Sequence, residues 1–145
     1  MPRPPVSPRV EKLLAKPNPA VVAAIRPDGK PTTSATWYLW QDGRIMLSMD
    51  VSRKRLEYLR ANPNVSVNVI DKDDMYDSVT LNGRVVEERP DDGLKDIDIL
   101  CMRYLGTPYP DRDNPRVTMW IEIDYWHIWE SSKETSGLDD VLDAR

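Results

Sequence analysis

The sequence predicts one mainly β domain, a six-stranded antiparallel β-barrel with short helices between the strands. Short segments in which apolar and polar residues alternate recur along the chain, as is typical of half-buried strands. Turn signals such as Asp28-Gly29 separate them. Strands and helices do not alternate in the βαβ manner, which argues against a parallel sheet. Because a closed barrel leaves no exposed strand edges, the pattern favours closure.

The chain begins with a proline-rich segment and a short helix. Its length of 145 residues suits a single domain over residues 1–145, with a flexible arm at residues 1–7. Ser7 is expected to cap a helix whose first turn contains Pro8. The apolar face of this helix holds Val10, Leu13 and Leu14. Proline residues at positions 17 and 19 end it.

Alternation then predicts six strands, at about residues 21–25, 31–40, 45–49, 65–69, 79–85 and 117–126. We expect the first three to form an antiparallel meander. Gly83 marks a β-bulge in the fifth strand. In the last strand Tyr125 falls on the apolar face, whereas Trp120 and Trp126 fall on the polar face. Large tryptophans on such a face are expected to cover a partner subunit or a ligand.

Two further helices are expected between these strands. One spans about residues 53–61 and ends at Asn62-Pro63-Asn64. The other spans about residues 91–105 and begins with two aspartates, which suit the positive end of the helix dipole. Residues 131–145 form a polar tail.

Composition excludes several classes of function. A net charge of −4 argues against binding nucleic acid. No apolar run reaches the roughly 20 residues of a membrane helix, and the N-terminus lacks a secretory signal, so a cytoplasmic location is expected. Cys101 and His127 are the only residues of their kinds, which excludes an internal disulfide and a Cys/His zinc cluster. We expect a packed or interfacial role for His127, a solvated turn at residues 71–74, and no metal site.

One segment, residues 48–56, predicts an anion site. Ser52 is expected to cap the second helix, which places Arg53, Lys54 and Arg55 in its first turn. That end of a helix already carries partial positive charge, so three cations there are unfavourable unless an anion is bound. A phosphate gripped by free N–H groups, the hydroxyl and the guanidinium forks would explain the arrangement. The alternative is that the three side chains simply extend into water.

The second strand adds a hydroxyl-lined face. Thr32, Ser34 and Thr36 lie two residues apart and therefore point to the same side, whereas Trp37 points to the other. Such hydroxyls can hydrogen-bond the polar edge of a heteroaromatic ring. Threonine is also simply a good strand former, and that interpretation stays open.

The order of these elements resembles the split-barrel flavoproteins related to pyridoxamine-phosphate oxidase, and among them the F420-dependent class of small reductases. The resemblance covers about residues 19–129. It is carried by residues 19–31 (PAVVAAIRPDGKP), 43–54 (GRIMLSMDVSRK), 59–67 (LRANPNVSV), 81–86 (LNGRVV), 109–112 (YPDR) and 116–117 (RV).

The resemblance implies a split-barrel homodimer with two cofactor sites at the interface, each lined by both subunits. By position, the cofactor phosphate would contact Ser48, Arg53, Lys54 and Arg55. Residues around 32–37 would lie along the ring system, and Met49 and Ser52 belong to the same site. Either coenzyme F420 or FMN would satisfy this pattern. The chain shows no counterpart of the arginine-rich C-terminal substrate segment of pyridoxamine-phosphate oxidases, so oxidation of a vitamin B6 phosphate is not expected.

The function expected on this resemblance is an F420-dependent oxidoreductase. It would transfer a hydride from reduced deazaflavin to an electron-poor double bond of a small organic substrate. The alternatives are an FMN-binding oxidase or flavin reductase of the same fold, and a non-catalytic flavin or deazaflavin carrier. No residue is assigned as catalytic; Tyr38, Tyr76 and solvent are the candidate proton donors.

Overall fold

The structure is a computed structural model that describes residues 1–128, and within them it contains three α-helices, one 3₁₀ turn and seven strands. The helices are α1 (Pro8–Ala15), α2 (Lys54–Ala61) and α3 (Lys95–Leu105), with the turn η1 (Asp92–Leu94) before α3. The strands are β1 (Ala20–Ile25), β2 (Pro31–Thr36), β3 (Leu39–Gln41), β4 (Arg44–Asp50), β5 (Asn64–Asp71), β6 (Asp74–Pro90) and β7 (Arg116–Ile128).

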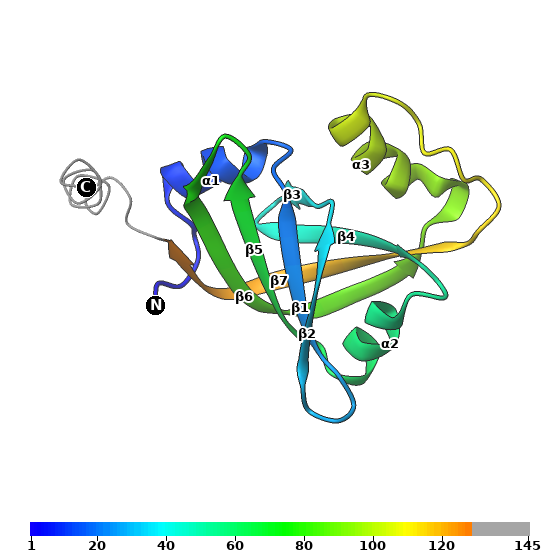
Figure 1. Ribbon diagram of the computed structural model, residues 1–145, viewed down its shortest axis with the longest axis horizontal. Helices are drawn as coiled ribbons and strands as arrows, with labels where there is room; N and C mark the ends of the chain where they lie inside the picture. Colours follow the sequence, from blue (N-terminus) through cyan, green and yellow to red (C-terminus); the bar gives the residue numbers. More distant parts are fainter. Residues whose placement is uncertain (129–145) are drawn as a thin grey trace, which may run out of the picture.

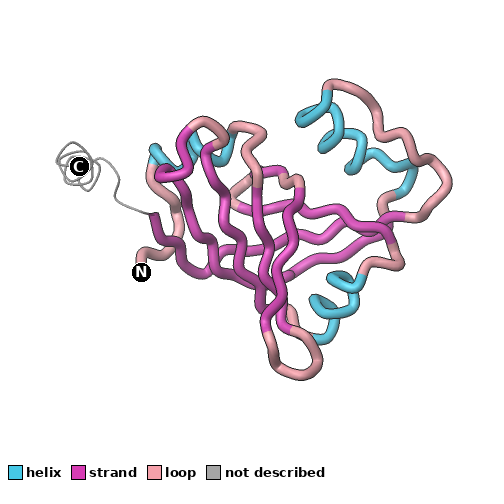
Figure 2. Tube along the Cα trace, viewed as in Figure 1, coloured by secondary structure: helices cyan, strands magenta, loops and turns pink. Residues whose placement is uncertain are grey.

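All seven strands belong to one antiparallel sheet in the order β2-β1-β5-β6-β7-β4-β3. The sheet curves strongly and the helices lie at its margins (Figures 1 and 2). The prediction of a mainly β antiparallel fold is therefore confirmed. The expected six strands, the closed barrel and the initial meander are wrong, because β2 and β3 lie at opposite edges of the sheet and do not pair.

The sheet is open because the expected strand 31–40 breaks at Trp37 and Tyr38. Tyr38 is fully buried, and its hydroxyl donates to the backbone oxygens of Leu14 (3.0 Å) and Lys16 (2.9 Å) at the end of α1. A side chain held in this way turns the backbone out of the β2 ladder. The chain then enters β3 at the other edge, where it pairs with β4.

The helix α1 follows the sequence prediction. The Ser7 hydroxyl accepts a hydrogen bond from the Val10 amide (3.3 Å), and the three predicted apolar residues are buried in the main core. The preceding segment, for which we expect a flexible arm, makes two hydrogen bonds with Trp126: its amide donates to the Pro2 carbonyl and its indole to the Arg3 carbonyl. The mobility of this arm stays a prediction.

A bulge is predicted at Gly83 in the strand that becomes β6, but the structure places the bulge in β7, opposite Gly83. The register shifts between Asn82 and Gly83, so one extra residue of β7 is accommodated near Asp124. After this bulge the alternation of β7 reverses. Trp126 consequently points into the core and Tyr125 points outward, opposite to the sequence prediction. His127 is exposed rather than packed within the chain.

Trp120 lies on the outer face of β7 and joins a second, smaller apolar cluster. That cluster contains Met46 of β4 together with Ile97 and Leu100 of α3. Within the chain, the partner that covers this tryptophan is therefore α3, packed against the outside of the sheet.

Helix α3 starts later than predicted, because the backbone reverses at Gly93 and Leu94, which both have positive φ. An aspartate nevertheless interacts with the amino end of α3, as predicted. The buried carboxylate of Asp91 accepts hydrogen bonds from the amides of Asp96 and Ile97, both at 2.9 Å. Asp91 thus satisfies two amide groups that the helix itself leaves unpaired.

We expect Asp91→Ala to lower the free energy of unfolding by about 2 kcal/mol, the upper part of the range for loss of a helix cap. Chemical denaturation measures this change. The matched control is Asp92→Ala, at a neighbouring exposed residue, which should change stability by less than about 0.5 kcal/mol. Equal effects of the two substitutions would contradict the capping role.

The predicted polar tail at residues 131–145 lies outside the described residues. Among residues 1–128, no helix is long and apolar enough to cross a membrane.

Candidate functional site

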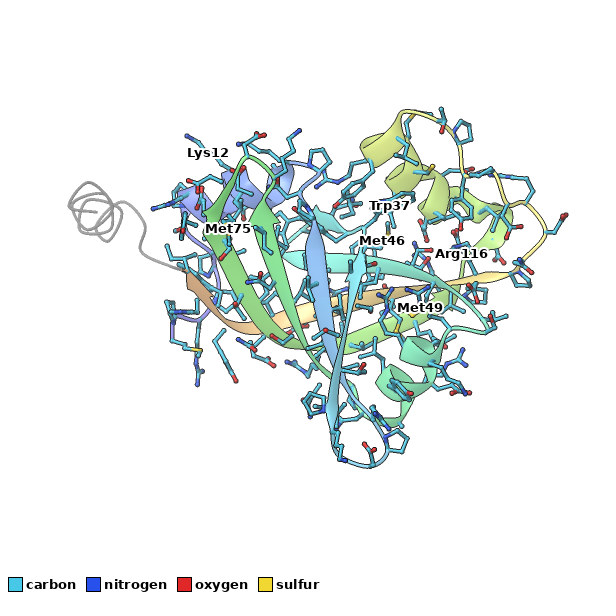
Figure 3. All side chains as sticks on the ribbon, in the orientation of Figure 1. Lys12, Trp37, Met46, Met49, Met75 and Arg116 are labelled. Atoms are coloured by element: carbon cyan, nitrogen blue, oxygen red, sulfur yellow. The ribbon has the colours of Figure 1, made fainter. Side chains whose placement is uncertain are left out.

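A cavity of about 540 Å³ lies between α3, the outer face of β4 and the end of β2. A second hollow of about 510 Å³ adjoins it at the start of α2, and the two share Asp50, Arg53 and Arg55. Figure 3 shows three side chains that line the main cavity, Trp37, Met49 and Arg116, each carried by a different segment of the chain. The two adjoining hollows therefore lie where the sheet is open.

Arg55 lies between the edge strand β2 and strand β4. Its guanidinium donates to the hydroxyls of Ser34 (3.1 Å) and Thr36 (3.3 Å) on β2, and to the carbonyl of Ser48 (3.4 Å) on β4. These bonds link strands that do not pair with each other. Arg55 is only 7% exposed, and its Nε is buried without a hydrogen-bond partner.

The electrostatics around Arg55 are unfavourable in the isolated chain. Burial, followed by the neighbouring cations Arg53 and Arg116, lowers the pKa of Arg55 to about 10. Among the described residues, no carboxylate forms an ion pair with any of these three arginines. Asp50 is the nearby acid, and its pKa is lowered mainly by its hydrogen bond from Ser52 and also by Arg116 and Arg53. A buried cation with this surplus of positive charge favours a bound anion.

The helix cap predicted in this segment is wrong in detail. Helix α2 begins at Lys54, its N-cap position is Arg53, and no side chain caps it. The backbone amide and hydroxyl of Ser52 donate instead to the Asp50 carboxylate. The amino end of α2 is consequently open toward the second hollow, since Arg53 and Lys54 both line it. Lys54 is exposed and pairs with Glu57 on the same helix.

Arg116 lines the main cavity but is not among the predicted site residues. Its Nε donates to the Ser48 hydroxyl (3.0 Å), and its guanidinium lies 4.8 Å from the centre of the Tyr109 ring. The Tyr109 hydroxyl also accepts a hydrogen bond from Arg116 (3.3 Å). Arg116 and Arg55 thus approach the same residue, Ser48, from two sides, which no local sequence pattern indicates.

The opposite wall of the cavity is aromatic and apolar. The rings of Trp37 and Tyr104 stack with their centres 5.5 Å apart and their planes 15° from parallel. Ile97 and Leu100 of α3 add aliphatic surface. Tyr104, Ile97 and Leu100 of the third helix are not among the predicted site residues, although the apolar face of that helix was the available signal. One wall therefore suits a flat, apolar ring and the other suits an anion.

The structure brings all ten predicted site residues to one of the two adjoining hollows. The main cavity is lined by Thr36, Trp37, Ser48, Met49, Arg53 and Arg55. The second hollow is lined by Thr32, Ser34, Ser52, Arg53, Lys54 and Arg55. Their roles as ligand contacts stay predictions.

The two tyrosines considered as proton donors do not line either hollow. Burial raises the pKa of Tyr38 above its usual value, and its hydroxyl is already bonded to two carbonyls. Tyr76 lies near the start of β6 and is exposed. Within the described part of the chain, no group of three or more His, Cys, Asp or Glu residues is arranged to hold a metal ion.

A mainly β fold built on one open antiparallel sheet with short helices is typical of the split-barrel class related to pyridoxamine-phosphate oxidase. The chain matches the family model described as pyridoxamine 5'-phosphate oxidase over residues 6–130, and it belongs to this family. A comparison with curated proteins returned no match.

Solved structures with a similar fold include flavin- and deazaflavin-related proteins. An F420 reductase is 29% identical to this chain, with a TM-score of 0.74; the match covers 81% of this chain and 94% of that one. A FAD-binding protein from Mesorhizobium loti is 24% identical, with a TM-score of 0.59 and coverage of 83% and 92%. General stress protein 26 from Bacillus anthracis is 22% identical, with a TM-score of 0.62 and coverage of 82% and 89%. The last two similarities concern the fold alone.

Proposed function

We propose that this chain is an F420-dependent oxidoreductase that reduces an electron-poor double bond of a small organic substrate. The observation that carries the proposal is Arg55, a buried guanidinium without an acidic partner among the described residues, at the amino end of a helix and beside a cavity with an aromatic wall. A phosphate-bearing, ring-containing cofactor fits both walls of this cavity.

In this proposal the basic residues hold the cofactor and the aromatic wall orients it. Arg53, Arg55 and Arg116 would hold the phosphate, and Lys54 would add positive charge at the edge of the site. Trp37, Met49 and Thr36, which line the main cavity, would lie along the ring, whereas Thr32 and Ser34 would face the second hollow. When bound, the reduced deazaflavin supplies the hydride, and the protein supplies orientation and exclusion of water.

Two observations favour a deazaflavin over FMN. The similar F420 reductase has the highest TM-score of the three compared structures. In addition, cations are not confined to one point, since Arg53 and Lys54 extend the positive surface into the second hollow. That surface would accommodate the longer anionic tail of F420, whereas FMN has a single terminal phosphate. FMN binding by the same site is the alternative function.

The proposal includes a homodimer in the cytoplasm. Strand β2 is an edge strand; its exposed Thr33 lines the second hollow, and its exposed Ala35 lines the main cavity. Unpaired edges of this kind are commonly covered in the native assembly. A second subunit at this edge would complete the cofactor site. The single cysteine, Cys101, is buried and unpaired, as is usual for proteins of a reducing compartment.

The experiment that tests the function is a titration of the purified chain with F420 and FMN side by side, followed by fluorescence. We expect F420 to bind at least about tenfold more tightly than FMN, the discrimination that one or two extra charged contacts provide. Reduced F420 should then be oxidised in the presence of activated alkenes or quinones.

Three other results would lead to different conclusions. Tight FMN binding without F420 binding would make the chain an FMN protein. F420 binding without oxidation of its reduced form by any acceptor would indicate a carrier. If neither compound binds, the cofactor proposal is wrong.

A further inference from the structure

Arg103, on α3, holds together three segments that meet at the split of the sheet. Its guanidinium donates to the carbonyls of Leu14 (3.2 Å), Ala15 (3.0 Å) and Lys16 (2.6 Å) at the carboxyl end of α1. Its Nε donates to the carbonyl of Tyr38 (3.2 Å), in the link between β2 and β3. One side chain therefore fixes α3 to α1 and to the break between the two edge strands.

The same guanidinium also supports the aromatic wall of the cavity. It lies 5.7 Å from the centre of the Tyr104 ring and 5.2 Å from that of Tyr38. Tyr104 in turn stacks on Trp37 and donates its hydroxyl to the Asn18 carbonyl (2.7 Å). Tyr104 is thus held through its ring face, and Trp37 is held through the neighbouring backbone at Tyr38.

We propose that Arg103 is a positioning residue for planar ligands: it fixes the Trp37–Tyr104 wall against which the ring of the bound cofactor packs. The inference rests on the proposed function. Arg103 does not line the cavity, so it acts through the two aromatic residues rather than by contact with the ligand. A lysine could not replace it, because a single ammonium group lacks the planar fork that reaches four carbonyls.

This arrangement separates ring binding from phosphate binding. The arginines proposed to hold the phosphate, Arg53, Arg55 and Arg116, lie at the start of α2 and on β7. Arg103 instead lies on α3 and contacts α1 and the β2–β3 link. Loss of Arg103 should weaken binding of the ring and leave the contribution of the phosphate unchanged. Loss of Arg55 should instead reduce the contribution of the phosphate and leave ring binding unchanged.

The test uses each cofactor together with its phosphate-free counterpart: F420 with 7,8-didemethyl-8-hydroxy-5-deazariboflavin, and FMN with riboflavin. Dissociation constants and stoichiometries are measured by fluorescence for the unchanged chain, R103M, R103K and R55M. We expect R103M to weaken each cofactor and its counterpart by the same factor, about tenfold, the contribution of one good aromatic stacking contact. The induced circular dichroism of the bound ring should also change. R84M, which removes an arginine paired with Asp124 and Glu122, is the matched control and should change nothing.

The outcomes separate this inference from the proposed function. If the unchanged chain binds none of the four compounds, the proposed function fails and the inference fails with it. If the unchanged chain binds and R103M binds equally well with a lower melting temperature, Arg103 is only structural and the inference alone is wrong. If R103M does not fold, R103K decides in the same way, since it keeps the charge but loses the fork. A change in the ratio between a cofactor and its phosphate-free counterpart in either Arg103 variant would also overturn the inference.

Discussion

Replacing Arg55 by methionine should weaken cofactor binding by roughly 30- to 150-fold while the chain remains folded. A charged hydrogen bond to phosphate in a buried site is worth about 2–3 kcal/mol, which corresponds to this factor. Methionine is chosen because it retains most of the length and apolar surface of arginine without the charge. The expected effect exceeds that of the exposed Arg53 and Lys54, whose charges water already screens.

Stability should change little in this variant because two effects oppose each other. Lowering of the pKa of Arg55 to about 10 means that its charged form is disfavoured in the folded chain by about 3 kcal/mol. This penalty is present at neutral pH and falls as pH rises above 10, where folded Arg55 loses its proton before unfolded Arg55 does. Methionine removes the penalty, but it also removes three hydrogen bonds, each worth about 1 kcal/mol. We therefore expect a net change within about 1 kcal/mol.

Titration with F420 or FMN measures the affinity, and chemical denaturation without ligand measures the stability. Arg60→Met is the control, because Arg60 lies on the same helix, is exposed and pairs with Glu88 away from the cavity. It should leave the affinity unchanged. If an Arg55 variant folds and binds the cofactor as tightly as the unchanged chain, the proposed phosphate site at Arg55 is wrong.

Replacing Gly83 by alanine should lower the free energy of unfolding by about 4 kcal/mol, the range of the most damaging single substitutions. A Cβ atom at this position would lie 2.0 Å from the Glu122 carbonyl oxygen and 2.9 Å from its carbonyl carbon. Both are backbone atoms of β7, so relief requires the two strands to separate at the bulge. The close approach of the backbones, rather than an unusual φ, is what requires glycine here.

Thermal and urea denaturation of the Gly83 variant would check this expectation. The neighbouring change Asn82→Ala is the control, because Asn82 is partly exposed on the same strand; its effect should stay within about 1 kcal/mol. If the Gly83 variant were as stable as the unchanged chain, the close contact between β6 and β7 would be incorrect.

The local elements were predictable because their signals lie within a few residues of each other. The start of α1 at Ser7 and Pro8 and the end of α2 at Asn62 both follow from the chemistry of single residues. The candidate site was predictable for the same reason, since Arg53, Lys54 and Arg55 stand together in the sequence after a strand. The family resemblance added the expectation of a flavin-type cofactor, and the family match confirms the fold behind it.

The remaining features depend on contacts between distant residues. The break in the second strand follows from Tyr38 bonding to the end of α1, about twenty residues away. The burial of Trp126 follows from a bulge that the alternation of β7 alone does not reveal. Arg116 and Tyr104 join the site only because β7 and α3 return to β4 and to the end of β2. A periodic pattern in one segment cannot specify such meetings.

A crystal structure with F420 or FMN bound tests most directly whether the α2 cations hold a cofactor phosphate. We expect phosphate oxygens about 3 Å from the Arg55 guanidinium and near the free amides at the start of α2, with the ring against Trp37 and Tyr104. A phosphate bound elsewhere, with Arg53 and Arg55 making no contact with the ligand, would contradict it.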